Sequence, residues 1–362
     1  MFEMIRVLHV FHDMGNGGTE HFVMNYYRRI DRSLVQFDFL TSVEEPGFWD
    51  EEIRSLGGKI FHAYPFGENP IKNYHDIARI VRENHYRIVH RHTGSAFGYF
   101  DLRAARRGGA DQLILHAHNT DAGKPIVHQA AKLLLKIPCH HYSCSREAGR
   151  FLFGENECFS IIPNAIDTRR FSFQSAVRDR IRREIGIDNK LVIGHIGRFQ
   201  RQKNHGRLVA IFAEIHKQRP DSILVCVGAG EKMEETKEIT HRMGLDQSVL
   251  FLGQREDVPA LLSAFDAFLL PSLYEGFPVV LVEAQSNGLK CFVSQEANPV
   301  SVNITGNVTF IPLPASDETW ADTLLQSDLS RDPMALNRVK DAGYDIADAT
   351  GALTQKYLDM IK

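Results

Sequence analysis

The sequence has little of what marks several classes of protein. Its five cysteines form no Cys-x-x-Cys pair, and an odd number of thiols does not suit a disulfide framework. It has no apolar run of about 18 residues, so no transmembrane helix is predicted, and no signal-peptide pattern precedes the first predicted strand. Its formal net charge of -3 excludes a broadly basic protein that binds nucleic acid. We therefore expect a cytoplasmic globular protein with reduced thiols and no nucleic-acid partner.

Patterns of metal ligands are also scarce. Cys139 and Cys144 flank two histidines, but no second pair of ligands follows at the spacing of a zinc site. Thirteen of the 17 histidines lie within residues 1–170 without forming such a pattern. The sequence predicts no metal site and no cofactor.

The length and the alternation of elements point to two α/β domains. The 362 residues, 43% of them hydrophobic, suffice for two domains with cores of their own. Short β-rich runs alternate with helical segments throughout, which is typical of doubly wound α/β folds. Two series of strands are predicted, joined near residue 175 by a charged stretch without strand signals. The first series lies at 5–12, 36–41, 59–62, 88–92, 112–116, 141–144 and 158–162. The second lies at 191–196, 223–227, 249–252, 267–270, 290–294 and 309–311.

We therefore predict a Rossmann-like domain over residues 1–172 and a second one over residues 173–345. A final helix within residues 346–362 is expected to pack back on the first domain. Two such domains facing each other would form an interdomain cleft at the carboxyl ends of both sheets, where open α/β folds bind ligands.

Charge is distributed unevenly over the first domain. Residues 71–170 carry 15 Lys or Arg against 9 Asp or Glu. Lys132 and Lys136, with Arg103, Arg106 and Arg107, could dock to anionic lipid, which would make the protein a peripheral one at the inner face of a membrane. A solvated surface of mixed charge and an ordinary amphipathic core helix over residues 126–135 are the alternatives.

The most informative segment is Pro271–Gln285. An apolar strand is followed by a turn with Gly276, Phe277 and Pro278 and then by a predicted helix. Glu275 lies in the turn and Glu283 in the helix, eight positions later. The free N–H groups at the start of such a helix suit a phosphate, and the two carboxylates could each meet a hydroxyl-bearing part of a sugar nucleotide. The alternative is a helix-capping acid and an unrelated glutamate.

Three further loops follow predicted strands of the second half. Arg198 and Lys203 follow its first strand and form a sensible pair for a diphosphate. Gly228 and Gly230 follow the next strand, where a nucleotide would need room. Arg255 lies in a later loop that could contact a base. Solvated loop charges and plain turns are the alternatives.

The first half offers two weaker signals. Gly17 and Gly18 allow a close approach of backbone to an anion, although the dinucleotide fingerprint is absent. His116 and His118 lie at the end of a strand, and His118 could bond to a reacting sugar or an acceptor. His116 is expected to be a buried, satisfied histidine.

Together and in this order, Gly17-Gly18, Arg198 with Lys203, Gly228-Ala-Gly-Glu231 and Glu275-x7-Glu283 resemble the retaining GT-B glycosyltransferases. The closest match is the branch that builds bacterial capsular and exopolysaccharides, and the similarity covers essentially the whole chain. The resemblance implies a donor sugar held by Glu275, ribose hydroxyls held by Glu283 and a diphosphate neutralised by Arg198 and Lys203. It implies further donor contacts from the backbone of Gly276, Phe277, Pro278 and Val279, and a place for His118 beside the sugar on the acceptor side.

The function so implied is the metal-independent transfer of a hexose or N-acetylhexosamine, with retention, from a nucleoside diphosphate sugar to a glycan or polyprenyl-linked acceptor. The absence of Asp-x-Asp agrees with metal-independent chemistry. UDP is the expected nucleotide from the same resemblance. A nucleotide-sugar epimerase or phosphorylase and a non-catalytic sugar-nucleotide-binding protein are the alternatives, and the sequence makes no prediction of the oligomeric state.

Overall fold

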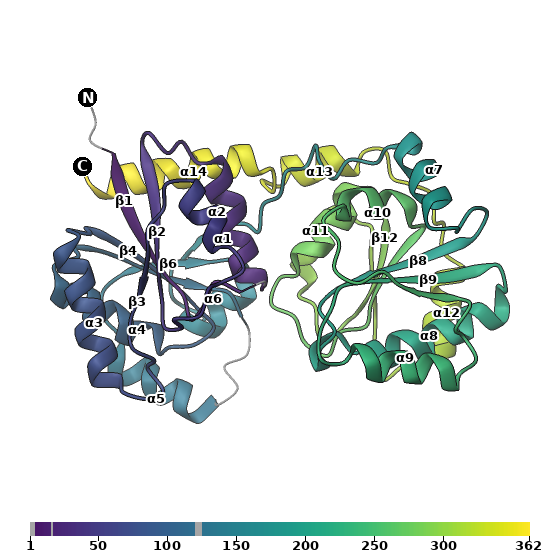
Figure 1. Ribbon diagram of the computed structural model, residues 1–362, viewed down its shortest axis with the longest axis horizontal. Coiled ribbons are helices and arrows are strands. Elements are labelled where there is room, and N and C mark those ends of the chain that lie inside the picture. Colours follow the sequence, from purple (N-terminus) through teal and green to yellow (C-terminus); the bar gives the residue numbers. More distant parts are fainter. Residues whose placement is uncertain (1–3, 16, 120–124) are drawn as a thin grey trace. The chain divides into compact units, whose positions relative to one another are not determined.

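A computed structural model describes residues 4–15, 17–119 and 125–362 (Figure 1). The chain divides into two compact units, and the second is inserted into the first. Unit 1 comprises Met1–Ala165 with Ile346–Lys362, and unit 2 comprises Ile166–Asp345. The division falls seven residues before the predicted one at 172. No helix in the described part of the chain is long and apolar enough to cross a membrane.

Unit 1 is a parallel sheet covered by helices on both faces. The strand order β3-β2-β1-β4-β5-β6-β7 is that of a doubly wound sheet, in which the order of the parallel strands reverses between β1 and β4. The strands are β1 (Ile5–Val10), β2 (Val35–Thr41), β3 (Ile60–His62), β4 (Ile88–Thr93), β5 (Gln112–Ala117), β6 (His140–Ser143) and β7 (Ser160–Ile161). The helices are α1 (Gly18–Arg29), α2 (Asp50–Ser55), α3 (Pro70–Glu83), α4 (Gly98–Gly108), α5 (Pro125–Leu135), α6 (Arg146–Phe153) and α14 (Ile346–Met360).

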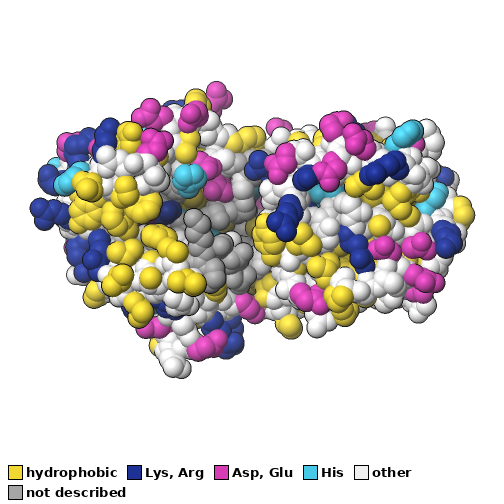
Figure 2. All heavy atoms as spheres, turned by 90° about the horizontal axis from the view of Figure 1, so that it is seen from below, with side chains coloured by type: hydrophobic (Ala, Val, Ile, Leu, Met, Phe, Trp, Pro, Cys, Tyr) yellow, Lys and Arg dark blue, Asp and Glu magenta, His cyan; other side chains and the backbone are white. Residues whose placement is uncertain are grey.

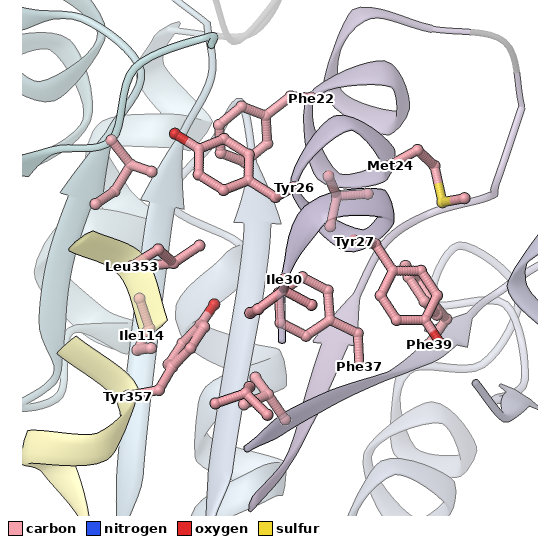
Figure 3. Packing of buried hydrophobic residues seen from close by; sticks show 14 of the residues in the cluster. Phe22, Met24, Tyr26, Tyr27, Ile30, Phe37, Phe39, Ile114, Leu353 and Tyr357 are labelled. Atoms are coloured by element: carbon pink, nitrogen blue, oxygen red, sulfur yellow. The ribbon is translucent and has the colours of Figure 1, made fainter. Parts of the chain in front are cut away.

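The core of unit 1 uses residues from both ends of the chain. Tyr26 and Tyr27 of α1 are fully buried against the sheet, beside Phe37 of β2. Leu353 and Tyr357 of α14 reach the same cluster (Figure 3). The last helix of the chain therefore completes a core that the first helix and strands begin.

Unit 2 repeats this plan with the strand order β10-β9-β8-β11-β12-β13, which reverses between β8 and β11. Its strands are β8 (Leu191–Ile196), β9 (Ser222–Val227), β10 (Val249–Phe251), β11 (Ala267–Leu270), β12 (Lys290–Ser294) and β13 (Val308–Ile311). Its helices are α7 (Ser175–Glu184), α8 (His205–Gln218), α9 (Met233–Arg242), α10 (Val258–Ala264), α11 (Val279–Ser286), α12 (Asp317–Leu325) and α13 (Ala335–Asp341), with short 3-10 turns at Arg201–Lys203 and Val300–Val302.

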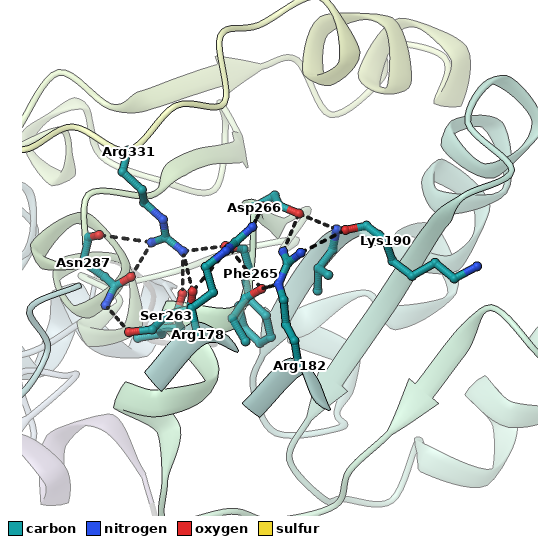
Figure 4. A network of polar contacts seen from close by, with 11 residues as sticks. Arg178, Arg182, Lys190, Ser263, Phe265, Asp266, Asn287 and Arg331 are labelled. Atoms are coloured by element: carbon teal, nitrogen blue, oxygen red, sulfur yellow. Dashed lines mark hydrogen bonds and ion pairs between the residues drawn. The ribbon is translucent and has the colours of Figure 1, made fainter. Parts of the chain in front are cut away.

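An arginine-rich network fastens α7 and the segment before α13 to the centre of unit 2 (Figure 4). Arg178 and Arg182 of α7 bond to the Asp266 carboxylate at 2.5 and 2.7 Å. Arg331 donates to the backbone carbonyl groups of Leu262, Ser263 and Phe265. Burial lowers the pKa of Arg331 to about 9. Because these guanidinium groups cap carbonyls next to β11, they hold the strand that leads into the candidate site.

Each predicted strand coincides with an observed one to within two residues at either end. The charged stretch 171–190 contains helix α7, for which no element was predicted. Its apolar residues are few, and arginine contacts with the α10–β11 connection hold it in place instead of a broad hydrophobic face.

Candidate active site

The candidate site of unit 2 is built at the reversal between β8 and β11. The loop after β8 carries Arg198 and Lys203, and the turn after β11 carries Glu275. Because the two strands are parallel neighbours, both loops leave the same edge of the sheet. In doubly wound folds this is the place where ligands bind.

Glu275 is fixed by three side chains from these two loops. It is only 6% exposed. One oxygen accepts hydrogen bonds from Lys203 Nζ and Ser272 Oγ, both at 2.6 Å. The other oxygen accepts from Gln202 Nε2 at 3.0 Å. The sequence analysis assigned Lys203 and Glu275 to one donor site. In the structure they form a direct, largely buried ion pair.

The two loops are also joined through their backbones. Leu273 donates its N–H to the carbonyl of Gln202 at 2.8 Å. Asn204 adopts the left-handed conformation, with φ of 55°, and its side chain donates to the Pro271 carbonyl at 3.1 Å. Asparagine tolerates this conformation better than most residues, so it turns the chain sharply into α8.

Gly228 and Gly230 have a structural reason to be glycine. Both have positive φ, and a Cβ atom would lie 2.1 Å from the Gly197 carbonyl oxygen in the first case and 2.4 Å from that of Phe199 in the second. The N–H of Phe199 donates to the Ala229 carbonyl at 2.9 Å, so the loops after β8 and β9 run side by side. Arg198 projects from this paired platform. Its side chain is exposed, and within the described ranges its guanidinium has no partner.

Helix α11 begins with open backbone donors. Its N-cap residue is Pro278, which provides no side-chain cap. The N–H groups of Gly276, Val279 and Val280 meet no acceptor among the residues that the structure describes. Phe277 is buried and stacks on Tyr344, with ring centroids 5.6 Å apart, which fixes the turn. Free N–H groups and the positive end of a helix dipole favour an anion here.

Glu283 lies in α11, beyond this helix start. The residue keeps some exposure, but many protein atoms surround its carboxyl group, and this desolvation raises its pKa to about 7 against a weaker opposing effect of Arg170. No side chain of the described regions donates a hydrogen bond to it. The carboxyl group is thus an acceptor with no donor among the residues that the structure describes. Arg255, by contrast, is engaged, because its Nε and Nη2 bond to the Asp257 carboxylate at 2.8 and 2.7 Å.

In unit 1, the glycine turn before α1 is already in contact with a carboxylate. Helix α1 begins at Gly18 with Gly17 as its N-cap. The Glu20 carboxyl accepts hydrogen bonds from the N–H groups of Gly17 and of Glu20 itself, and burial raises its pKa to about 7. A Cβ atom on Gly17 would lie 2.3 Å from that carboxyl. The anion that the sequence analysis expected at Gly17 and Gly18 would meet the chain's own acid there.

His118 lies just beyond β5 and is the partly exposed member of a buried group of histidines. Its Nε2 bonds to His92 Nδ1 at 2.9 Å, and burial lowers its pKa to about 3. His116 was expected to be satisfied, but its Nδ1 bonds to His90 and its buried Nε2 has no partner among the described residues.

Sequence reasoning missed a pocket in unit 1 with a volume of 470 Å³. Two phenylalanine rings and a partly buried ion pair line it, and Arg91 Nε bonds to the Asp101 carboxylate at 2.5 Å. His12 and Ser42 follow β1 and β2, so their position after parallel strands was the available signal. The full lining is His12, Ser42, Pro65, Phe66, Gly67, Glu68, Arg91, Phe97 and Asp101. Gln202, Asn204 and Ser272 were also missed, although each lies within four residues of a predicted site residue.

Comparisons with known proteins identify the family of the chain. Residues 177–344 match the family model of glycosyl transferases group 1, and residues 16–170 match that of glycosyltransferase family 4. EpsF of Bacillus subtilis strain 168, provisionally named as a glycosyltransferase, is 37% identical over 97% of this chain and 96% of its own. An Escherichia coli enzyme named UDP-Gal:alpha-D-GlcNAc-diphosphoundecaprenol alpha-1,3-galactosyltransferase is 32% identical over 66% of this chain and 63% of its own.

Among solved structures, that of Anabaena HepE in complex with UDP and glucose superposes with a TM-score of 0.79. It covers 98% of this chain and 100% of HepE at 19% identity, which supports the fold alone. Two parallel-sheet units of this kind define the GT-B architecture, and the protein is a glycosyltransferase. Within that class the chain belongs to the family of glycosyl transferases group 1, with an amino-terminal region of glycosyltransferase family 4.

Proposed function

We propose that this glycosyltransferase moves a hexose or N-acetylhexosamine from a UDP-sugar to a hydroxyl of a glycan or lipid-linked acceptor, with retention and without a metal. The observation that carries the proposal is the Lys203–Glu275 pair beside the exposed Arg198 and the open start of α11. This arrangement gathers two cations and free N–H groups within one unit. Such a set suits a diphosphate that gains charge as its bond to the sugar breaks.

The carboxylates suit the two ends of a sugar nucleotide. Glu283, to which no side chain in the described part of the chain donates, can accept hydrogen bonds from the ribose hydroxyls. Glu275 lies in the turn after β11, beside Lys203, where its carboxylate suits a hydroxyl of the donor sugar. The tight hold on Glu275 favours a positioning role over a role as a nucleophile.

In the proposed step, the acceptor oxygen forms a bond to the anomeric carbon as the bond between that carbon and the β-phosphate oxygen breaks. The acceptor proton passes to the departing phosphate, which leaves as UDP. Arg198, Lys203 and the helix start stabilise the charge on that phosphate. No second carboxylate near Glu275 is required, and the sugar keeps its anomeric configuration because the acceptor enters on the face that the phosphate leaves.

The relatives support the nucleotide and the acceptor class. The name of the E. coli relative specifies UDP-galactose and a diphosphoundecaprenol-linked acceptor, and HepE was crystallised with UDP and glucose. We infer a UDP-sugar and a glycan or lipid-linked acceptor for this chain as well, in bacterial capsular or exopolysaccharide synthesis. The pocket of unit 1 supports an acceptor role, because Phe66 and Phe97 offer apolar surface beside polar groups, as sugars require.

Helix α5 supports a peripheral contact with the inner face of a membrane. Ile126 and Leu133 are each 85% exposed, and Leu134 is 74% exposed. Figure 2 shows hydrophobic side chains gathered on one face of unit 1, with Lys and Arg at its margins. Of the basic residues that the sequence analysis grouped here, Arg103 donates to the carbonyls of Leu134 and Leu135 and so caps α5. Its role is therefore partly structural.

The function is tested with purified protein, UDP-sugars and acceptors in the presence of a chelator. Nucleotides are first ranked by their effect on the melting temperature, because a ligand that binds the folded state raises it. We expect stabilisation by UDP that the Glu283→Ala variant loses, and release of UDP only when an acceptor is added. Conversion of the donor into an epimer without UDP release would contradict transfer, and activity that returns only with added metal would contradict the metal-independent mechanism.

A further inference from the structure

Five histidines of unit 1 lie on one face at the carboxyl edge of three neighbouring strands. His9 of β1 is the register partner of His90 in β4, and His92 of β4 is that of His116 in β5. Residues two apart on a strand share a face, so His92 lies beside His90, and His118 follows His116. The rings stack, with centroids 4.3 Å apart for His90 and His92 and 4.1 Å apart for His116 and His118.

The hydrogen bonds divide this group into two separate chains. In the first, His9 Nδ1 bonds to His92 Nε2, and His92 Nδ1 bonds to His118 Nε2, both at 2.9 Å. In the second, His116 Nδ1 bonds to His90 Nε2 at 3.0 Å, and His90 Nδ1 bonds to the Tyr357 hydroxyl at 2.7 Å. Only the first chain reaches His118, whose Nδ1 has no partner within residues 4–15, 17–119 and 125–362.

The first chain permits only two arrangements of protons. Burial lowers the pKa of all three of its rings, so each is neutral near pH 7 and has one N–H donor and one bare acceptor nitrogen. If His92 carries its proton on Nδ1, His118 must accept at Nε2 and therefore carries its own proton on Nδ1. If His92 carries its proton on Nε2, the same argument places the proton of His118 on Nε2. A mixed arrangement would set two N–H groups or two lone pairs against each other at 2.9 Å.

We propose that His92 and His9 are positioning residues that hold His118 through its Nε2, so that the three rings always share one tautomer and His118 offers only Nδ1 to a ligand. With the protons on Nδ1, His118 donates to the ligand; with the protons on Nε2, it accepts. A sugar hydroxyl can do either, so the chain can adapt its polarity to the hydroxyl it meets. The inference rests on the proposed function in that the hydroxyl belongs to the donor sugar or the acceptor.

A metal ion is the competing occupant of this group. His9, His90 and His92, and also His92, His116 and His118, could each bring three nitrogens within 4.8 Å of one another. In each group, two of the nitrogens already face each other in a hydrogen bond of 2.9 Å, and neither group includes a carboxylate to offset the charge of a buried cation. The hydrogen-bonded chain is therefore favoured, and metal content is one outcome of the test.

The test is the tautomer of each ring, read from long-range 1H–15N spectra of the full chain labelled with 15N-histidine. A His118→Gln variant assigns the His118 signals. We expect His9, His92 and His118 of the wild type to carry the proton on the same nitrogen. In His92→Phe, which keeps a buried ring but removes both nitrogens, His118 becomes a mixture of both tautomers. In His90→Phe, the matched control from the second chain, the His118 tautomer stays as in the wild type.

Different tautomers among the three wild-type rings would overturn the inference, and this readout remains if His92→Phe fails to fold. An unchanged His118 tautomer in folded His92→Phe, or one equivalent of a transition metal in protein purified without chelators, would also overturn it. The proposed function can fail separately. Shared tautomers in a protein that transfers no sugar would support the hydrogen-bonded row of histidines but remove the ligand proposed for His118. Sugar transfer by a protein with unshared tautomers would overturn only the inference about the histidines.

Discussion

At the scale of single residues, the two cations of the donor site differ in how far the fold depends on them. Lys203 neutralises a carboxylate that is 6% exposed, whereas Arg198 is exposed and contacts no described carboxylate. The sequence showed both as loop cations after one strand. It could not show the difference, because the partner of Lys203 lies 72 positions away, in the turn after another strand.

Arg198→Ala should therefore separate chemistry from stability. We expect it to slow sugar transfer by roughly 100-fold or more, as the loss of one preorganised charge in a site does, with an unchanged melting temperature. Lys203→Ala should abolish transfer and lower the free energy of unfolding by ~3 kcal/mol, because it removes the cation paired with the buried Glu275 carboxylate. Transfer assays and denaturant unfolding of both variants measure this, and a Lys203→Ala protein as stable as Arg198→Ala would contradict the burial argument.

Glu283 should make the stability of the protein depend on pH. Its pKa in the folded protein is about 7, above the ordinary value of 4.5. The stability that this group contributes is present below the ordinary pKa and is lost as the pH rises through 7, because ionisation in the folded state becomes costly. Glu283→Gln should thus gain melting temperature relative to the wild type between about pH 5 and about pH 8.

Thermal unfolding of the wild type and Glu283→Gln across this range tests the point. Glu318→Gln, which changes an exposed acid at the start of α12, is the control and should show no such trend. An equal effect of both substitutions at every pH would show that the Glu283 carboxyl is well solvated.

At the scale of elements, the glycines after β9 support the site by shaping a loop. Gly228→Ala should destabilise unit 2 by more than the ~1–2 kcal/mol that a positive φ alone costs, because its Cβ would lie 2.1 Å from the Gly197 carbonyl oxygen. Gly253→Ala is a matched control, with φ of +67° and nothing within 4 Å of the added atom. Urea unfolding compares the two, and equal losses would mean that the loops yield easily.

The order of elements could be predicted from the sequence much better than the contacts between them. The alternation of short β-rich runs with helical segments located the strands, because this pattern can be read from neighbouring residues alone. The chain from His9 through His92 to His118 was not predictable, because it depends on which strands are neighbours and in what register. The contact between Glu20 and Gly17 was not predictable either, because it depends on the path of the turn before α1. This contact places a carboxyl group where the sequence predicted a bound anion.

At the scale of the whole molecule, the proposed contact of helix α5 with lipid can be tested. Leu133→Ser with Leu134→Ser should weaken salt-sensitive binding to vesicles that contain anionic lipid, since both side chains are largely exposed. Ile71→Ser, which removes a 72% exposed apolar side chain from α3, is the control for a general loss of surface hydrophobicity. Vesicle sedimentation measures the effect, and equal binding by all three proteins would remove the membrane hypothesis.

The insertion of unit 2 into unit 1 bears on how the chain is made. Helix α14 supplies Leu353 and Tyr357 to a core begun by α1 and β1, so unit 1 lacks part of its interior until α14 has left the ribosome. Unit 2 is contiguous and can fold while that segment is still being translated. Unit 1 is therefore the later of the two units to mature, and a premature stop before α14 would damage the unit whose synthesis began first.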